Sequence, residues 1–359
     1  MIINKIKCIT TLIIISIFFH NEIRNEKKYL IKNRVCIINL HNSINVGNIL
    51  VKFSLFTKIK EFGLKPLLII PKLLHELNNS FLTKTTNFTL IKENFSELKE
   101  NDYDYVILNS DQTWGYYNRK YFYDIAFLKF AYNWKIPKFI YATSIGQDYW
   151  FFNKEEEEQG KKLLKNFTGI SFREKGLIKL AEEHLGIKGK FVLDPTLLID
   201  KKYYLNQIKE YKTDFTSNDK FIFVYQLDKN LIFEKVINDS HTKFNFKINK
   251  LQLFKDDFVE RFIFGISNCQ AVLTDSFHGT IFSIMFNKPF IAFINNNRGK
   301  GRFDNLKEIF NLNRNIIDTR INKSPDINIL LEPLKINQTL FSELKNFSVN
   351  YLKKHLNIE

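Results

Sequence analysis

The chain has 359 residues, of which 45% are hydrophobic and 25% are charged, and its formal net charge is +15. This composition excludes a disordered chain, and the length favours two lobes, because single hydrophobic cores stop growing at roughly 250–300 residues. The positive charge favours anionic partners such as phosphates, acidic glycans or a membrane surface. Three widely separated cysteines argue against a disulfide framework or a metal cluster, and no zinc-finger spacing or recognition-helix pattern indicates nucleic-acid binding.

An apolar segment, residues 8–19, lies near the start of the chain and is followed by a polar stretch, residues 20–28. Its twelve residues are fewer than the roughly 20 that a membrane-spanning helix needs, and no small-residue cleavage site follows it. Three interpretations stay open: a poorly ordered or weakly membrane-associated leader, an uncleaved anchor, or a signal peptide. We place residues 1–33 outside the fold and expect a cytoplasmic protein, with peripheral membrane association left open.

Short apolar runs alternate with amphipathic stretches through residues 34–200, which form the expected first lobe. This alternation is typical of parallel strands joined by helices, and runs that are apolar on both faces are typical of buried parallel strands. Strands are predicted at Val35–Leu40, Leu67–Ile70, Tyr105–Leu108, Lys138–Ala142, Ile170–Phe172 and Phe191–Leu193, and helices at Ile49–Phe62, Lys154–Asn166 and Glu174–Leu185.

The same alternation resumes in the expected second lobe, residues 201–335, after a polar segment. Strands are predicted at Phe221–Gln226, Ala271–Thr274 and Phe290–Phe293, and helices at Phe258–Ser267, Thr280–Phe286 and Arg302–Phe310. A last helix, from Leu340 to about Leu356, lies in the C-terminal segment 336–359 and is expected to pack across both lobes. The predicted fold class is therefore α/β, with two Rossmann-like lobes built on parallel sheets.

His278 lies between a predicted strand and a predicted helix, where ligands of open α/β sheets bind. An imidazole can transfer a proton near neutral pH, and Gly279 lets a ligand approach the backbone closely. The N–H groups of Gly279 and Thr280 could hold a phosphate or a carboxylate at the helix N-terminus. The alternative is that His278 only caps the helix or bonds a nearby carbonyl.

The predicted strand Tyr105–Leu108 is followed by Asp111, Gln112 and Trp114. A carboxylate, an amide and an aromatic face are the groups that bind a sugar, although an Asx-turn beside a core tryptophan is an equal alternative. Asn45 and Asn48 lie in the loop after the first strand, where we favour a helix cap by Asn48 over a phosphate-binding loop.

Basic side chains follow two further strands. Arg173 comes directly after Ile170–Phe172 and could bind a carboxylate or phosphate through both arms of its guanidinium; a surface ion pair with Glu174 or Asp194 is the alternative. Arg298 and Arg302 follow the strand Phe290–Phe293 and add positive charge on the side of the second lobe.

Four segments stand at these predicted strand exits in a fixed order. They are Ser110-Asp111-Gln112-Thr113-Trp114, Ser171-Phe172-Arg173-Glu174, Val192-Leu193-Asp194-Pro195-Thr196-Leu197-Leu198 and Asp275-Ser276-Phe277-His278-Gly279-Thr280-Ile281-Phe282-Ser283. In this order and spacing, the segments resemble the polysaccharide pyruvyl transferase family. The resemblance spans Val35 to Phe310, which is nearly the whole predicted fold.

This resemblance implies a two-lobed architecture similar to that of GT-B glycosyltransferases, with the active site between an acceptor-side first lobe and a donor-side second lobe. It implies phosphoenolpyruvate as the donor and a sugar diol of a cell-surface polysaccharide, or of its precursor, as the acceptor. The products are a pyruvate ketal and inorganic phosphate. Phosphoenolpyruvate is a co-substrate, and neither a cofactor nor a metal is expected. The sequence favours no oligomeric state and leaves a lipid-linked acceptor open.

The resemblance also assigns roles to individual residues. His278 matches the family's histidine and is expected to act as a general acid, while Asp111 orients or deprotonates the sugar hydroxyls. Arg173 matches the arginine of the Arg-Glu motif expected to contact the donor. Further donor contacts are expected from Ser276, Gly279, Thr280, Arg298 and Arg302, and acceptor contacts from Asn45, Asn48, Gln112 and Trp114. Some members carry an arginine where this chain has Ser276, so we expect Arg298 or Arg302 to supply that contact.

Two alternative functions fit the same features. A glycosyltransferase with a nucleotide-sugar donor would use the same two-lobed fold and basic cleft. A catalytically idle relative would bind an acidic glycan and release no phosphate.

Overall fold

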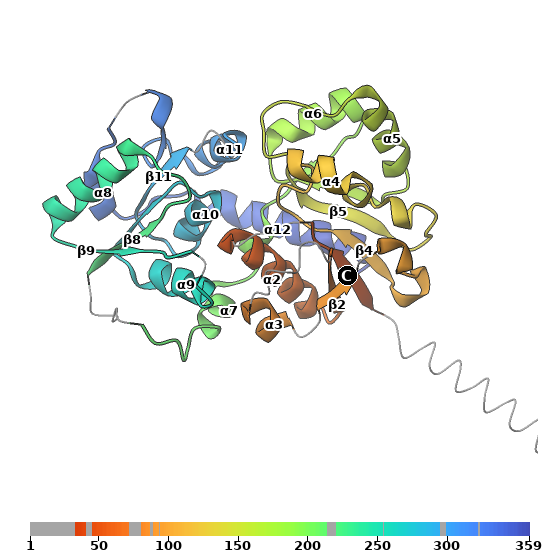
Figure 1. Ribbon diagram of the computed structural model, residues 1–359, viewed down its shortest axis with the longest axis horizontal. Helices are drawn as coiled ribbons and strands as arrows, with labels where there is room; N and C mark the ends of the chain where they lie inside the picture. The colour runs from red at the N-terminus through yellow and green to blue at the C-terminus, as the bar shows by residue number, and fades with distance from the viewer. Residues whose placement is uncertain are drawn as a thin grey trace, which may run out of the picture.

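Two α/β lobes lie side by side in the computed structural model (Figure 1). The structure describes residues 33–40, 45–71, 80–86, 89–92, 94–213, 220–253, 255–294, 299–321 and 324–359. The predicted leader therefore lies outside the described residues apart from Asn33, and so does Arg298. In the part of the chain that is described, no helix is both long enough and apolar enough to cross a membrane.

The first lobe is built on a seven-stranded parallel sheet with the strand order β3-β2-β1-β4-β5-β6-β7. Its strands are β1 (Arg34–Ile38), β2 (Lys65–Pro71), β3 (Thr89–Lys92), β4 (Tyr105–Leu108), β5 (Lys138–Thr143), β6 (Gly169–Phe172) and β7 (Lys190–Phe191). Its helices are α2 (Val46–Glu61), α3 (Ser80–Thr86), α4 (Tyr116–Ala126), α5 (Lys154–Leu164) and α6 (Lys175–Leu185).

The second lobe is built on a five-stranded parallel sheet with the strand order β12-β11-β10-β8-β9. A short helix, α7 (Lys201–Asn206), precedes it along the chain. Its strands are β8 (Phe221–Tyr225), β9 (Lys247–Lys250), β10 (Ala271–Thr274), β11 (Phe290–Ile294) and β12 (Ile316–Asp318). Its helices are α8 (Leu231–Phe244), α9 (Phe258–Asn268), α10 (Phe277–Met285) and α11 (Gly301–Phe310), and α12 (Gln338–His355) follows them.

The predicted fold class, α/β with two parallel sheets, is confirmed, and all nine predicted strands are present. The sequence missed β3, β9 and β12, and of the helices it missed α3, α4, α7 and α8. Two predicted helix starts were wrong in the same direction. Helices α2 and α10 both begin three residues earlier than expected, so His278 lies in the first turn of α10 and not in the loop before it.

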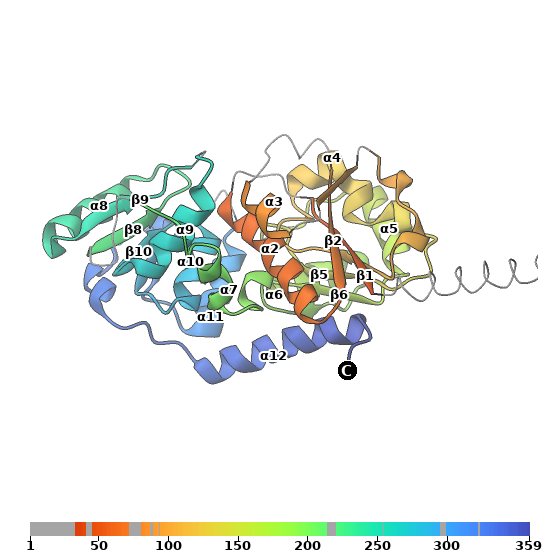
Figure 2. The same ribbon diagram turned by 90° about the horizontal axis from the view of Figure 1, so that it is seen from below.

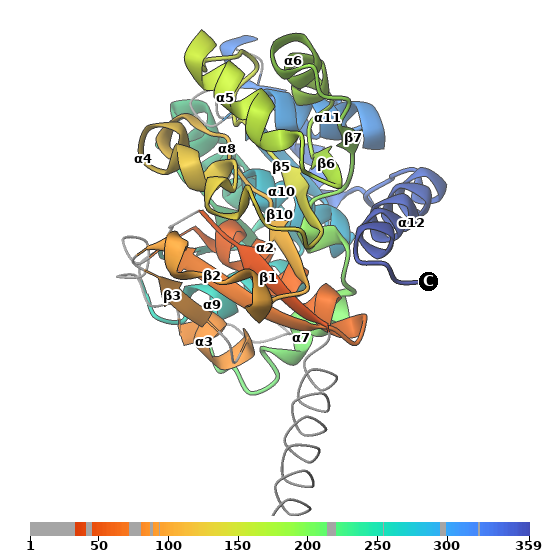
Figure 3. The ribbon, with the colours of Figure 1, turned by 90° about the vertical axis from the view of Figure 1, so that its right-hand side faces the viewer.

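Helices cover both faces of the first sheet, as Figure 3 shows from the side of this lobe. On one face, Ile37 and Phe139 share a hydrophobic cluster with residues of α2 and α12. On the other face, Cys36 and Ile140 share a second cluster with residues of α4, α5 and α6. Neighbouring residues of each strand thus enter different cores, which explains why these strands are continuous apolar runs.

Helix α2 lies between the two lobes and is buried on nearly all sides. Its Phe53 packs against Tyr204, and Tyr204 in turn contacts Phe282 of α10. Because this helix has almost no solvent-exposed face in its first three turns, polar side chains in those turns are buried as well; Asn48, Lys52 and Ser54 are all less than 9% exposed. Such buried polar groups require partners within the protein.

Helix α12 runs beneath both lobes (Figure 2). Its Phe341 packs edge-on against Phe310 of α11 in the second lobe, with ring centroids 5.6 Å apart. Its Tyr351 packs against Phe139 of β5 in the first lobe, at 6.3 Å. The predicted packing of the last helix across both lobes is therefore confirmed.

Both sheets have a point at which the strand order reverses, between β1 and β4 in the first sheet and between β8 and β10 in the second. Ligands of open α/β sheets bind outside the carboxyl ends of strands at such switch points. The N-terminal turn of α2 follows β1, and the N-terminal turn of α10 follows β10. Helices α2 and α10 contact each other, so the two switch points face one another at the lobe junction.

Candidate active site

Asp111 is the first site residue after β4, and its backbone is held in an unusual conformation. Its φ angle is +82°, in the left-handed region that side-chain-bearing residues seldom adopt. The neighbouring strand β5 has a register irregularity between Ile140 and Thr143, and Asp111 forms an isolated bridge to Thr143. Irregularities of this kind recur next to active sites because they re-aim a side chain.

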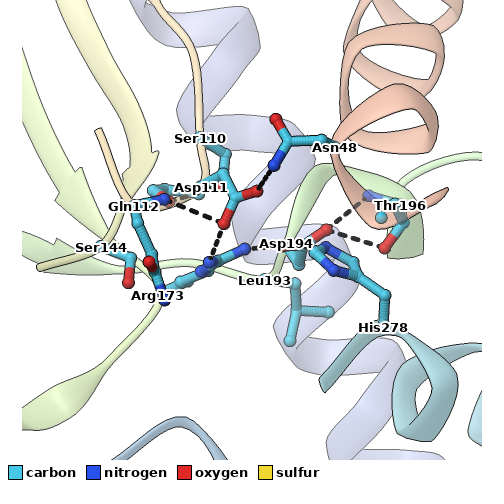
Figure 4. A network of polar contacts seen from close by, with 12 residues as sticks. Asn48, Ser110, Asp111, Gln112, Ser144, Arg173, Leu193, Asp194, Thr196 and His278 are labelled. Atoms are coloured by element: carbon cyan, nitrogen blue, oxygen red, sulfur yellow. Dashed lines mark hydrogen bonds and ion pairs between the residues drawn. The ribbon is translucent and has the colours of Figure 1, made fainter. Parts of the chain in front are cut away.

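The Asp111 carboxylate accepts hydrogen bonds from three directions (Figure 4). Asn48 Nδ2 donates to Oδ2 at 2.5 Å, while Arg173 Nη2 and the Gln112 N–H donate to Oδ1 at 2.6 and 2.9 Å. These bonds come from α2, from the residue after β6 and from the neighbouring loop residue. The carboxylate is therefore fixed in position.

Arg173 joins Asp111 to a second buried carboxylate. Its Nη1 donates to Asp194 Oδ2 at 2.6 Å, and the side chains of Arg173 and Asp194 are each only 1% exposed. Arg173 is therefore not exposed to bind the donor with both arms of its guanidinium, because both terminal nitrogens bind carboxylates. The alternative pairing with Asp194 is present, but inside the protein and not at its surface.

His278 approaches this network from the second lobe (Figure 4). Its Nε2 lies 3.7 Å from Asp194 Oδ2, which is beyond hydrogen-bond distance, and the residue is 4% exposed. Nε2 has no hydrogen-bond partner among the described residues. A buried imidazole nitrogen without a partner is uncommon in folded proteins and is a position where a ligand can bind.

Gly47 makes room for His278 at the N-terminus of α2. A Cβ atom on Gly47 would lie 1.9 Å from His278 Nδ1, far inside van der Waals contact. No other residue type fits there without displacing the imidazole. Gly47 therefore positions the ring of the second lobe against the first lobe.

The first turn of α10 differs from the expected anion site. Ser276 is the N-cap of this helix, and its Oγ accepts the N–H of Gly279 at 3.3 Å. The N–H and the hydroxyl of Thr280 both donate to the Ser276 carbonyl. The N–H groups expected to bind the donor are therefore occupied within the helix cap that Ser276, Gly279 and Thr280 form.

Two expected acceptor residues also have structural roles. Trp114 is fully buried, stacks on Phe127 with ring centroids 5.1 Å apart, and donates its indole N–H to the Ala126 carbonyl. Trp114 therefore offers no face to a sugar, and the core alternative is correct. Asn45, not Asn48, caps α2 by accepting the Gly47 N–H at 2.8 Å.

Gln112 remains at the edge of the network. It is half-buried, its backbone N–H donates to Asp111, and its side chain packs against Gly146, where an added Cβ would lie 2.6 Å from the Gln112 amide carbon. Gln112 thus lies beside the acid network, between the β4–α4 and β5–α5 connections.

A second positive group, Arg302, comes from α11. The guanidinium carbons of Arg302 and Arg173 lie 5.1 and 5.0 Å from the centre of the Phe277 ring. Cations at this distance from an aromatic face are attracted by its electron density. Phe277 of the second lobe thus brings the two arginines together, while Arg298 lies outside the described residues.

Glu174 is a buried carboxyl beside the two arginines. Its Oε1 accepts a hydrogen bond from the Ser144 hydroxyl, and its Oε2 has no hydrogen-bond partner among the described residues. Burial raises the pKa of Glu174, although Arg173 and Arg302 offset part of this effect. The site therefore contains one carboxyl that holds a proton more readily than an exposed glutamate does.

Two other charged groups of the site, Asp194 and Arg302, have lowered pKa values. Burial would raise the pKa of Asp194, but the neighbouring His278 and Arg173 outweigh burial and hold the pKa of this carboxyl well below its usual range. Burial and the neighbouring Arg173 guanidinium lower the pKa of Arg302 to about 10. An anion beside Arg302 would reverse that effect, so the site favours a negatively charged ligand.

Lys52 is a further charged residue that the sequence did not reveal. It lies one turn after Asn48 on α2 and is 6% exposed. Burial lowers the pKa of Lys52 to about 8, and the Asp111 carboxylate offsets only part of this effect. A buried amine with such a pKa can bind an anion or exchange a proton near neutral pH.

Lys52→Met is expected to raise the free energy of unfolding at pH 7 by about 1–3 kcal/mol, because one unit of pKa corresponds to about 1.4 kcal/mol. The folded chain loses the Lys52 proton near pH 8 and the unfolded chain near pH 10.5. Between these pH values the unfolded state binds more protons, so the free energy of unfolding of the unaltered protein rises with pH. The difference in stability between Lys52→Met and the unaltered protein therefore shrinks. Urea unfolding at pH 7 and pH 10 measures both effects.

Lys60→Met is the matched control, since Lys60 is an exposed lysine of the same helix. It should change stability by less than about 0.5 kcal/mol at either pH. Equal stability curves for Lys52→Met and the unaltered protein at both pH values would show that Lys52 carries no burial penalty.

The sequence missed Lys52, the roles of Asp194 and Glu174, and the ring of Phe277. Three of these residues lie inside the segments Ser171–Glu174, Val192–Leu198 and Asp275–Ser283, so their position in those segments was the available signal. Lys52 lies outside these segments, and a single lysine in a predicted helix is usually solvated, so the sequence did not mark it as a site residue. Among the described residues, no three His, Cys, Asp or Glu side chains converge as metal ligands do.

The fold and the position of the site define a two-lobed α/β protein of the GT-B type. Solved structures with this fold include UDP-GlcNAc 2-epimerase from Neisseria meningitidis bound to UDP-GlcNAc, with a TM-score of 0.54, 12% identity, and coverage of 91% of this chain and 94% of that chain. The UDP-GlcNAc 2-epimerase of Methanocaldococcus jannaschii has a TM-score of 0.53 and 12% identity, with 89% and 99% covered. At these identities the likeness concerns the fold alone.

The amino-acid sequence matches the model of one protein family. A family model for polysaccharide pyruvyl transferases matches residues 23–297, which is most of the chain. The chain therefore belongs to the polysaccharide pyruvyl transferase family and is a transferase. Among curated proteins, none matches it in sequence.

Proposed function

We propose that this transferase moves the pyruvyl group of phosphoenolpyruvate onto two hydroxyls of one sugar in a cell-surface polysaccharide or its precursor. The observation that carries the proposal is the buried His278 imidazole. Its Nε2 has no hydrogen-bond partner in the described part of the chain and lies 3.7 Å from Asp194, in a network that also fixes Arg173 and Asp111. The reaction needs a proton donor, a fixed carboxylate and positive charge near the phosphate of the donor.

His278 is the general acid of the proposed reaction. It gives a proton to C3 of the enol phosphate, the double bond to C2 is lost, and C2 becomes an oxocarbenium-like electrophile. The first sugar hydroxyl attacks C2, the C2–O bond to phosphate breaks, and the second hydroxyl then attacks C2 to close the ketal. Of the two hydroxyl protons, one returns to His278 and the other leaves with inorganic phosphate.

The negative charge of the donor requires positive groups near its phosphate and carboxylate. Burial and the neighbouring Arg173 lower the pKa of Arg302 to about 10, and an anion beside Arg302 would offset both effects. Lys52, with a pKa of about 8, supplies a second cation from the first lobe. Fixed charges of this kind stabilise the charge that develops as phosphate leaves. Arg173 acts through Asp111 and Asp194 as a positioning residue.

The acceptor hydroxyls are assigned to the side of the first lobe. Asp111 is held by three donors and faces the junction, where it can orient a hydroxyl or take its proton. Gln112 lies next to it at the edge of the network. The proposal therefore assigns the acceptor to the first lobe, and His278 and the donor to the second.

Donor binding and phosphate release test the proposal together. Phosphoenolpyruvate at about a hundredfold excess over its Kd should stabilise the protein by about 2.7 kcal/mol, a rise of several degrees in Tm. Phosphate should be released from it only when an acceptor from a panel of soluble oligosaccharides is present. Stabilisation by UDP-GlcNAc and not by phosphoenolpyruvate would favour a nucleotide-sugar transferase, and stabilisation by neither donor would favour an idle glycan-binding relative.

A further inference from the structure

Four tyrosines are exposed on the first lobe. Tyr116, Tyr117, Tyr121 and Tyr149 are 62%, 53%, 52% and 57% exposed, and we refer to them as the tyrosine surface. They are four of the seven large hydrophobic side chains that the described residues expose. Exposed aromatic side chains that gather in one place mark an interaction site more often than scattered ones do.

The tyrosine surface begins at the edge of the active site. Gly115, just before α4, donates its N–H to the Gln112 carbonyl at 2.8 Å, and Tyr116 is the next residue. The loop that carries Tyr149 begins beside Gly146, which packs against the Gln112 side chain. Both segments therefore extend outward from Gln112, which lies next to Asp111.

The rings of the tyrosine surface are held by their neighbours. Tyr117 and Tyr121 are one turn apart on α4, with ring centroids separated by 4.8 Å. Tyr116 and Tyr149 both pack against Phe151, at 5.8 and 6.3 Å. Side chains fixed in this way lose little entropy when a ligand binds.

Helix α4 itself is anchored to the neighbouring helix. Arg119 binds Glu156 of α5 through Nε and Nη2, at 2.9 and 2.8 Å, and the Tyr123 hydroxyl donates to the Glu156 carbonyl. The two helices are neighbours in Figure 1. Tyr116, Tyr117 and Tyr121 therefore stand on an anchored helix.

The chemistry of the tyrosine surface fits a glycan. Each tyrosine offers an apolar ring face and a hydroxyl, which match the C–H face and the hydroxyl groups of a pyranose. Arg119 and Lys120 lie between Tyr117 and Tyr121 along the same helix, and Lys120 Nζ is 4.9 Å from the Tyr121 ring centre. A stable protein interface has an apolar core depleted of charge, which this surface lacks.

We propose that the tyrosine surface binds the polysaccharide chain next to the sugar that is modified. The inference rests on the proposed function for the assignment of the acceptor, but the binding itself requires no donor. It also gives the first lobe the aromatic sugar-binding role that the sequence analysis had assigned to the buried Trp114.

Native gels that contain dextran, galactan or mannan measure this binding directly. The unaltered protein should be retarded in at least one of them. The variant with all four tyrosines changed to serine should bind at least about tenfold more weakly, because it loses every stacking face. The variant with all four changed to phenylalanine keeps the faces and should retain most of the retardation. The double variant Leu331→Ser and Phe347→Ser removes two exposed apolar side chains elsewhere and should migrate like the unaltered protein.

Two outcomes would overturn the inference. One is that the unaltered protein is not retarded in any of the three gels. The other is that the four-serine variant is retarded as strongly as the unaltered protein. If light scattering then shows that only the unaltered protein forms dimers, the surface is a contact between copies of this chain.

Kinetics separate this inference from the proposed function. With an acceptor that supports phosphate release, the four-serine variant should raise the acceptor KM about tenfold and leave kcat and the donor-induced rise in Tm nearly unchanged. If phosphoenolpyruvate gives no phosphate while retardation persists and depends on the tyrosines, the proposed reaction fails and the glycan surface stands. Unchanged acceptor KM in the four-serine variant, together with unchanged retardation, contradicts the surface and leaves the reaction intact.

Discussion

His278→Ala is expected to lower kcat for pyruvyl transfer by about 10²–10⁴-fold, which is the usual contribution of a positioned general acid. The rise in Tm on adding phosphoenolpyruvate should persist, because the positive groups assigned to donor binding, Arg302 and Lys52, are unchanged. Phosphate release under saturating donor and acceptor measures the first effect, and thermal unfolding measures the second. A loss of kcat with donor binding retained is what removal of an acid predicts.

Two further variants separate proton transfer from packing. His278→Gln fills much of the same space but cannot give a proton near neutral pH, so it should be as inactive as His278→Ala. His241→Ala removes an exposed histidine of α8 and should leave kcat unchanged. Near-normal phosphate release by His278→Gln would assign His278 a packing role and remove the proposed acid from the mechanism.

Arg173→Met is expected to lower the free energy of unfolding by about 3–5 kcal/mol, because it leaves the buried carboxylates of Asp111 and Asp194 without their shared cation. The loss should be smaller at low pH, where the variant can protonate these carboxylates. In the unaltered protein the depressed pKa of Asp194 stabilises the fold above the ordinary carboxyl pKa of 3.8, and this stabilisation is lost as the pH falls below it. Urea unfolding at pH 7 and at about pH 3, which is below that value, measures both effects.

Arg314→Met is the matched control for this prediction. Arg314 also binds a carboxylate, Glu332, at 2.9 Å, but its side chain is 64% exposed. Exposed pairs contribute roughly 0–1 kcal/mol, so this variant should unfold almost like the unaltered protein. Similar unfolding free energies for Arg173→Met and Arg314→Met would mean that the lobe-junction network does not stabilise the fold.

The strands were predictable because their signal is local. A run such as Tyr105–Leu108 is apolar on both faces, and burial between two helical layers is the arrangement that suits such a run. The strand exits then indicated Asp111, Arg173 and His278, which the structure brings into one network. The polar strand β9, Lys247–Lys250, had no such pattern, since its residues are half-buried or exposed at the edge of the sheet.

The contacts of individual side chains were not predictable from position alone. Trp114 occupies a strand exit as a ligand-binding residue would, but the hydrophobic cluster beneath α4 buries it. Lys52 became part of the site only because α2 lies between the lobes, which no periodicity within the helix indicates. The start of α10 lies earlier than predicted because the Ser276 hydroxyl caps the helix, and a serine in this position also fits a loop.

Gly47 and His278 belong to different lobes, and so do His278 and Asp194. Any opening between the lobes therefore separates the acid from its carboxylate and from the glycine against which it rests. Under the proposed mechanism, an enol phosphate bound in an open molecule meets no assembled proton donor. Under this mechanism, proton transfer to the donor therefore requires that the two lobes are closed on each other.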